Sequence, residues 1–503
     1  MNDDIMKAYI GALVQAKVTP EDLIKAFTQS ATSTSGLTYY DLEEGAKLLF
    51  PVITPLIQMI PRVKGKGGTA TNWRSVTGLN TANVPMGVAE GLRGGIVTTS
   101  TQDNTASYVT LGMEDTVSFE ADLAAVGFED LKALAVANLL RASRIGEERT
   151  VIGGQGTFGL GTAPTVTATG STTGGALATG TFHIRVVALT LAAFNRATLL
   201  LGVPTTQSYT RGDGTTQVVN AGASQVSADA TFNVASGSTG SATATWTAVP
   251  GAVGYAVFVG AAGGAAGAEV LNQLLTVNAA TITAVRSTVT PGTGFADVVG
   301  TAFNTDQSRN TLVFDGLFAI CAKSGSNAYN VSLNNGTLTA DAAGGIVEIN
   351  TALKDRWDNY RISPTHILVN SQELDNITKK VIAAGGVPLF RFLMDGNAGN
   401  AMQATAGTVV GTYLNRFSME GGRLIKIMLH PDVPAGSMIF YSDTIPYPIS
   451  GVQNILQIKT RREWYQLEWP LRNRQYEYGV YVDEVLQCYF PPAFGLMQNI
   501  KNG

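Results

Sequence analysis

Charged residues, histidines and cysteines are all scarce in this chain. Of its 503 residues, 14% are charged, three are histidines and two are cysteines. Cys321 and Cys488 form neither a metal-spaced pair nor a disulfide framework. His183, His366 and His430 are isolated in sequence, whereas a metal or nucleophilic site needs several such groups to converge. The sequence therefore predicts no catalytic, cofactor-binding or metal-binding residue, no cofactor, and a protein that is not an enzyme.

Long apolar runs and basic stretches are also missing. The best candidate for a membrane span, residues 48–60, is interrupted by Pro51 and Pro55 and falls short of the roughly 20 residues needed. The N-terminus lacks the basic region and apolar run of a secretory signal. The net charge is −4, without the basic stripe of a freely acting nucleic-acid binder. We expect neither a membrane protein nor a secreted one, but a chain kept in a reducing cytoplasm.

Two short motifs have simpler explanations than ligand binding. Residues 154–159 fit the glycine pattern of dinucleotide-binding loops, but they follow a predicted helix, whereas that loop follows a strand. Residues 211–213 spell Arg-Gly-Asp, and the Gly-Asp-Gly that overlaps them is typical of a tight turn. The carboxylate pair Glu147-Glu148 is expected to be solvated or to bind arginines of a neighbour.

A β-rich segment from about 164 to 303 differs from the sequence around it. It is dominated by Gly, Ala, Thr and Ser and contains no lysine. Residues 181–186, 244–249 and 255–259 alternate with period two, carry β-branched and aromatic side chains, and are separated by Gly and Pro turns. Such a pattern is typical of an all-β sandwich. Because the flanks carry helices and more charge, we interpret the segment as a sandwich inserted into another domain.

The sequence before this segment predicts short helices, an extended region and one long helix. Thr19 and Pro20 begin the second of two short helices within residues 1–47. Residues 64–110 carry too few large apolar side chains for an independent core, so they are expected to lie against a partner or to be flexible. Apolar residues at helical spacing predict a long helix over 128–152.

The sequence after the β-rich segment alternates helices and strands. The predicted elements are helices at 350–360 and 371–383, strands at 365–370, 424–429 and 437–441, and aromatic strands over the last fifty residues. This order of elements resembles the major capsid protein fold of tailed bacteriophages, an icosahedral shell fold shared with encapsulins and the herpesvirus capsid floor. The stretches that carry the resemblance are residues 48–63, 148–154, 364–370, 430–437 and 478–481. Residues 246–260 separately resemble immunoglobulin-like or fibronectin type III modules.

The resemblance implies an α+β fold with an inserted all-β sandwich. The expected parts are an N-terminal arm (1–62), an extended loop (63–114), a peripheral domain with the spine helix at 128–152 (115–160), an inserted immunoglobulin-like sandwich (161–304), the return of the peripheral domain (305–340), an axial α/β domain (341–454) and the C-terminal strands of the peripheral domain (455–503).

The resemblance also implies a structural role in a phage head. Such subunits assemble into hexamers and pentamers of an icosahedral shell that encloses double-stranded DNA. The implied partners are copies of the chain itself, scaffolding, portal and decoration proteins, and packaged DNA contacted non-specifically on the inner face; no membrane is expected. The implied location is the virion, after assembly in the host bacterial cytoplasm. Two alternatives stay open: an encapsulin-type bacterial shell protein, and a binding protein built around a fibronectin-like module.

The extended loop is where contacts between subunits are expected. In this family the loop lies over the adjacent subunit, which would supply the partner that its sparse apolar content requires. The residues expected to make inter-subunit contacts are Arg62, Trp73, Arg74, Pro85, Met86 and Arg93.

We predict that no isopeptide bond links the subunits of the mature particle. In one branch of the family a lysine of the extended loop joins an asparagine, but residues 67–131 contain no lysine, and Lys64 and Lys66 lie at the base of the loop. Boiled particles should therefore give a single band near 52.7 kDa on a denaturing gel. A ladder of oligomers resistant to heat, detergent and reductant would contradict this.

Overall fold

The structure is a computed structural model that describes most of the chain. The described residues are 53–79, 86–126, 130–383, 390–393, 403–406, 410–419, 422–445, 452–471 and 473–503. The chain divides into two units, and the larger, residues 51–119 and 132–503, holds nearly all described elements. The described part of the smaller unit contains most of the short helix α4 (Phe119–Ala124). The two arm helices expected within residues 1–47 lie outside the described residues.

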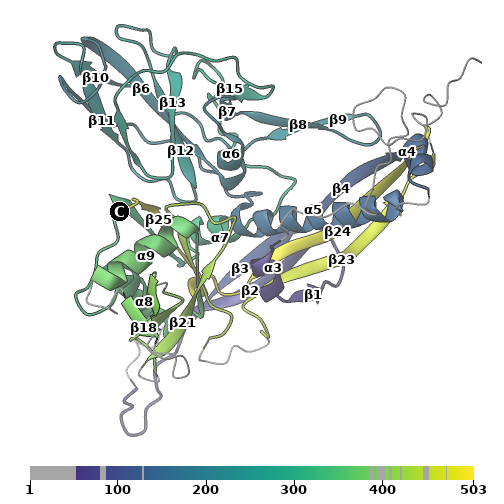
Figure 1. Cartoon of the computed structure of the whole chain (residues 1–503). Helices are drawn as coiled ribbons and strands as arrows, with labels where there is room; N and C mark the ends of the chain where they lie inside the picture. The colour runs from purple at the N-terminus through teal and green to yellow at the C-terminus, as the bar shows by residue number, and fades with distance from the viewer. Residues whose placement is uncertain are drawn as a thin grey trace, which may run out of the picture. The chain divides into compact units, whose positions relative to one another are not determined.

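The long predicted helix is confirmed as α5 (Leu131–Gly153), which runs beside a four-stranded sheet (Figure 1). The sheet has the order β1-β23-β24-β4, with β1 (Arg62–Lys64), β23 (Leu456–Glu468), β24 (Gln475–Cys488) and β4 (Val109–Ser118). Strand β1 pairs in parallel with β23, and the other neighbours are antiparallel. Val151 and Ile152 of α5 are fully buried with Ile458 and Leu486 of the sheet in one apolar cluster, which we call the main core.

A second region combines a six-stranded mixed sheet with two helices. Its order is β16-β25-β22-β17-β21-β20, with β16 (Tyr329–Gly336), β25 (Gly495–Ile500), β22 (Met438–Tyr441), β17 (His366–Val369), β21 (Arg423–Leu429) and β20 (Thr412–Asn415). Helices α8 (Val347–Tyr360) and α9 (Ser371–Ala383) match the predicted helices. Ile349 and Leu353 of α8 and Ile377 of α9 are buried against sheet residues such as Phe440.

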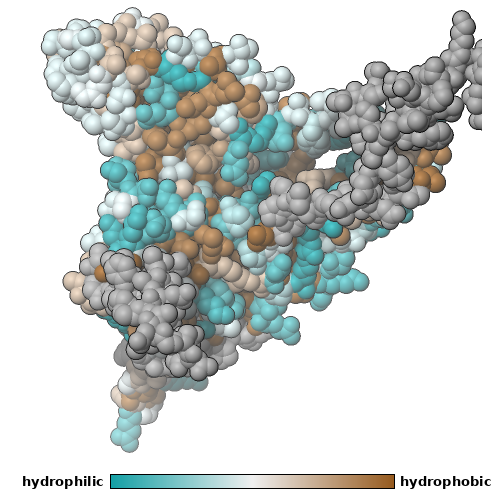
Figure 2. All heavy atoms as spheres, viewed as in Figure 1, coloured by the Kyte–Doolittle hydropathy of each residue, from teal (hydrophilic) through white to brown (hydrophobic). Residues whose placement is uncertain are grey.

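The β-rich segment forms two sheets that share an apolar core. One sheet has the order β10-β6-β12-β13 and the other β14-β11-β5, with β10 (Ala230–Val234), β6 (Gly180–Leu189), β12 (Gly254–Val259), β13 (Val270–Leu275), β14 (Ala279–Ile282), β11 (Ser241–Thr245) and β5 (Thr167–Ser171). Phe182 and Phe232 stack in this core, and Trp246 meets Tyr255 edge-on. The surface over β10 and β11 is mostly pale in Figure 2, which fits a composition of Thr, Ser, Gly and Ala.

The sandwich also packs against the rest of the larger unit. On the second face of its four-stranded sheet lie α6 (Leu191–Arg196), β7 (Val203–Pro204) and β15 (Phe295–Ala296). Leu191 and Val253 reach into the main core, where each is 3% exposed. At a separate place, the hairpin of β8 (Thr206–Thr210) and β9 (Thr216–Asn220) places its turn on β4, where the Gly212 N–H donates to Glu114 Oε2 at 2.8 Å. The sandwich is therefore joined to the sheet region by side chains as well as by its two chain connections.

The remaining elements are short helices and two hairpins that do not belong to these sheets. They are α3 (Pro55–Met59), α7 (Leu317–Ala322), the 3-10 helix η1 (Pro491–Ala493), the hairpin of β2 (Ala70–Leu79) and β3 (Thr99–Ser107), and the hairpin of β18 (Phe390–Leu393) and β19 (Gln403–Ala406). The mixture of helices and strands confirms the expected α+β class. Within the described ranges, no helix has both the length and the apolar character to cross a membrane.

A buried carboxylate joins three of these elements. Glu148, on the last turns of α5, accepts the backbone N–H of Leu56 at 2.7 Å and of Ile57 at 2.8 Å, both in α3. Its Oε1 also lies 2.7 Å from Nε2 of His430, which follows β21. Because the Asp432 N–H donates to Nδ1 of the same ring at 3.1 Å, Nε2 carries the proton and donates to Glu148. Both side chains are fully buried, so the carboxylate depends on these three donors in place of water.

Replacing Glu148 should destabilise the subunit strongly. Glu148→Ala leaves two N–H groups and a histidine buried without an acceptor, and we expect a loss of about 3–5 kcal/mol of unfolding free energy. The matched control is Arg141→Ala on the same helix, which removes an exposed hydrogen bond to Asn138 and should cost about 0.5 kcal/mol or less. Chemical denaturation of unassembled subunits measures both variants. Equal losses in the two variants would show that Glu148 does not have this role.

Candidate inter-subunit surfaces

The hairpin of β2 and β3 is held by a two-point ion pair on its exposed surface. Arg74 Nε lies 2.5 Å from Asp103 Oδ1, and Arg74 Nη2 lies 2.9 Å from Oδ2 of the same carboxylate. The hydrogen bond to Arg74 lowers the pKa of Asp103, and the same bond raises the pKa of Arg74. Both side chains are more than two-thirds exposed, so another molecule could still contact the two charged groups.

The segment between the two strands exposes a series of apolar side chains. Met86 is 95% exposed, Ile96 87% and Leu92 71%, and Val88 and Val97 are about half exposed. Every described residue from 86 to 100, Arg93 included, is exposed. Large apolar side chains rarely lie in water in such a run unless another molecule covers them. The predicted contact residue Pro85 lies outside the described residues.

Trp73 on β2 lies partly against its own chain. Its ring meets that of Tyr489 edge-on, with centroids 6.0 Å apart. Its indole Nε1 is buried and has no hydrogen-bond partner within the described chain, although a buried indole N–H usually finds one. Trp73 is thus neither fully packed nor fully satisfied by its own chain, and its contact with another subunit stays a prediction.

Arg62 at the start of β1 binds two carboxylates of its own chain. Its Nη1 lies 2.9 Å from Glu484 Oε2, and its Nη2 contacts Glu147 Oε1. Both carboxylates are fully buried, and Arg144 lies 3.9 Å from Glu147. Burial raises the pKa of Glu484, and the charge and hydrogen bond of Arg62 act in the opposite direction. The guanidinium therefore links α5 to the four-stranded sheet, and a contact of Arg62 with another subunit stays a prediction.

Cys321 and Cys488, for which the sequence predicted neither a metal site nor a disulfide, are the two cysteines of the chain. Both are free thiols, and both are buried. Burial raises the pKa of the Cys321 thiol to about 12 and raises that of Cys488 as well. Because the thiolate is the reactive form, these two groups are poor nucleophiles and metal ligands.

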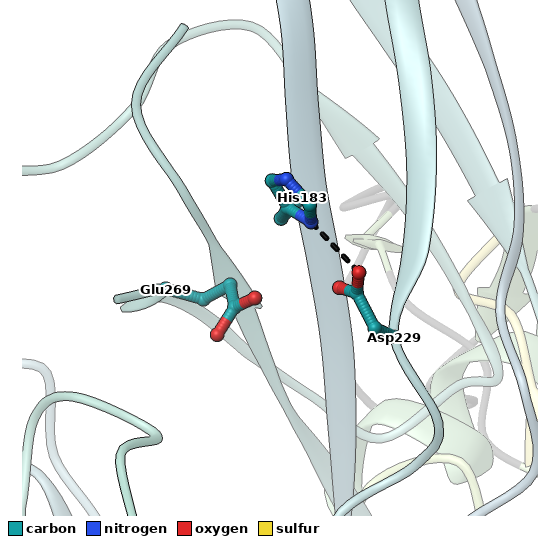
Figure 3. A group of neighbouring side chains, drawn as sticks. All are labelled: His183, Asp229 and Glu269. Carbon is teal, nitrogen blue, oxygen red and sulfur yellow. Dashed lines mark hydrogen bonds and ion pairs between the residues drawn. The ribbon is translucent and has the colours of Figure 1, made fainter. Parts of the chain in front are cut away.

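The structure also brings together one polar group that the sequence did not indicate. His183 on β6 lies beside Asp229, which precedes β10, and beside Glu269, which precedes β13 (Figure 3). These residues lie 46 and 86 positions apart from His183 in the sequence, so no local spacing marks them. The three residues meet because of the order of the strands in this sheet. Strand β6 pairs with β10 on one side and with β12 on the other, and β12 pairs in turn with β13.

No protein-family model matches the sequence, and no curated protein matches it. Solved structures that the chain is similar to include the capsid of a native GTA particle, at 11% identity, covering 94% of this chain and 100% of the other, with a TM-score of 0.41. The capsid of cyanophage A-1(L) is similar at 9% identity, covering 92% and 97%, with a TM-score of 0.41. An encapsulin of Synechococcus elongatus is similar at 13% identity over 37% of this chain and 57% of its own, with a TM-score of 0.20.

Proposed function

We propose that this chain is the major capsid protein of a tailed phage and that it assembles with copies of itself into the shell of the head. The observation that carries the proposal is the exposed apolar series on residues 86–97, at the end of a hairpin that its own chain covers incompletely. Burying one such side chain against another subunit contributes about 1.5–3 kcal/mol, so a few of them stabilise a contact that is repeated around a ring.

The arrangement of the rest of the larger unit fits this role. In the chain, the hairpin of β2 and β3 lies between β1 and β4, the two edge strands of the four-stranded sheet, so the sheet and the spine helix support it from both of its ends. Within the proposal, Trp73, Arg74, Met86 and Arg93 contact the adjacent subunit, and copies form the hexamers and pentamers of an icosahedral shell. Scaffolding, portal and decoration proteins and the packaged DNA are further partners of the proposal, and the virion is its location.

Charge placed on the loop should prevent assembly without unfolding the subunit. Leu92→Asp and Ile96→Asp change side chains that are exposed in their own chain, so the unfolding temperature should stay within about 2 °C of the wild type. Sedimentation velocity and negative-stain microscopy should show wild-type particles and unassembled variants. Val218→Asp, on the exposed hairpin of β8 and β9, is the control and should assemble. Normal particles from both loop variants would refute the proposed role of this loop.

We further propose that residues 161–304 form an insertion that the shell does not need. The two ends of the segment lie together, since the Gly161 N–H donates to Asp306 Oδ2 at 3.1 Å and the Leu160 N–H donates to Ser308 Oγ at 2.8 Å. Adjacent ends are what a tolerated insertion requires.

Replacing residues 162–303 by a short Gly/Ser linker should still allow shells to form. The deletion also removes Leu191 and Val253 from the main core, so we expect the shortened subunit to be less stable by about 2–5 kcal/mol. Negative-stain microscopy measures assembly, and a thermal melt measures the lost stability. If every linker length gives only unfolded subunit, the segment is an integral part of the fold.

A further inference from the structure

A histidine and two carboxylates from three segments converge on the four-stranded sheet of the sandwich. The Nδ1 atom of His183 lies 2.8 Å from Asp229 Oδ2, and one ligand atom from each of His183, Asp229 and Glu269 lies within 4.8 Å of the others. Figure 3 shows the imidazole and the two carboxylates directed toward a common space. This group lies in the sandwich, away from the loop on which the proposed function rests, and is independent of that proposal.

The carboxylate of Glu269 has few partners for a buried charge. Its side chain is fully buried. Both of its oxygens share one donor, the Gly267 N–H, at 3.1 and 3.0 Å. An ionised carboxylate has about four acceptor positions, so this one N–H fills only a small part of its capacity. A buried carboxylate in this condition favours a cation beside it.

Arg185 supplies only part of the positive charge that the group needs. Its Nε lies 3.5 Å from Asp229 Oδ1 and 3.5 Å from Glu269 Oε1, longer than the roughly 2.7–2.9 Å of a good charge-assisted hydrogen bond. With His183 neutral, one guanidinium faces two carboxylates, so the group carries one uncompensated negative charge. A proton on His183 would bring the group to neutrality, and a bound divalent cation would change its net charge from −1 to +1.

We propose that His183, Asp229 and Glu269 bind a divalent transition-metal ion, with Zn²⁺ as the best fit. One imidazole nitrogen and two carboxylate oxygens are a ligand set that Zn²⁺ accepts at about 2.0–2.2 Å, with water at a fourth position. Ligand atoms at that distance from a tetrahedral ion lie about 3.4 Å apart. His183 Nδ1 and Asp229 Oδ2, which share a hydrogen bond at 2.8 Å, would therefore move slightly apart and give up the shared proton, and the more distant ligand atoms, now within 4.8 Å, would move closer. Ca²⁺ prefers six to eight oxygen ligands, so the imidazole selects against it.

A metal at this place would link three separate segments of the sandwich. His183 lies on β6, Asp229 belongs to the connection before β10, and Glu269 belongs to the connection before β13. Because these ligands converge only in the folded chain, binding stabilises the folded state over the unfolded one. Zinc should therefore raise the unfolding temperature of the chain as well as bind to it.

The test is zinc binding by the full-length chain after dialysis against a chelator. Competition with a chromophoric zinc indicator at pH 7.5 should give one Zn²⁺ per subunit, and the same concentration of Ca²⁺ should not displace it. His183→Gln and Asp229→Asn should each weaken binding by at least tenfold. The control His366→Gln changes another partly buried histidine, one hydrogen-bonded to Thr365, and should bind zinc as the wild type does. Arg185→Gln should strengthen binding, because a nearby positive charge is removed.

The outcomes separate a metal site from a group that only binds a proton. A wild-type chain that takes up no stoichiometric zinc would overturn the proposal, whether or not the His183 ring titrates by NMR. Equal zinc affinity in wild type and His183→Gln would overturn it too, since the metal would then lie elsewhere. Melting curves with and without zinc show whether each variant is folded, so loss of binding is not confused with loss of structure.

Discussion

The buried carboxylate of Glu148 is the interaction on which the arrangement of the sheet region depends. It accepts two backbone N–H groups of α3 and the imidazole N–H of His430, so one side chain on α5 fixes the start of the extended segment and the end of β21. A buried charge tolerates such a position only when its hydrogen bonds are complete. Arg62, which lies a few residues after α3, repeats this kind of link with Glu147 and Glu484. Two consecutive glutamates of one helix therefore set where the chain enters the four-stranded sheet.

In contrast to Glu148, the side chains of residues 86–97 are not covered by their own chain. There the chain carries apolar side chains in water and no core of its own to bury them. The proposed assembly makes use of this contrast. The four-stranded sheet and α5 would keep their shape, and the apolar side chains of residues 86–97 would be covered only when another subunit binds. In the proposed assembly, surfaces between copies would need fewer charged residues than surfaces in water, which fits the low charge of the chain.

Much of the fold was predictable because its signals are local. The 3.6-residue period of α5, the strands at 366–369 and 438–441, and helices α8 and α9 all appear where periodicity and turn residues placed them. What the sequence did not reveal is carried by residues far apart in the chain. Glu148 and His430 are separated by 282 positions in the sequence. The sequence around Glu148, with arginines nearby on the same helix, would also be the same whether the carboxylate was in water or buried. For the same reason, nothing marked Leu191 and Val253 as parts of the main core, or His183 as a neighbour of two carboxylates.

The turn on the hairpin of β8 and β9 has a consequence for how the sandwich is presented. The Gly212 N–H holds Glu114 on β4, while the Gln498 side-chain amide donates to the Ala252 carbonyl at 2.6 Å at another place. A body supported at two separate points cannot pivot about either one, unlike a domain that hangs from a flexible linker. On a closed shell, such sandwiches would repeat with the spacing and orientation of the lattice itself. Any contact made through one sandwich would then be repeated at fixed distances, so weak contacts would act together.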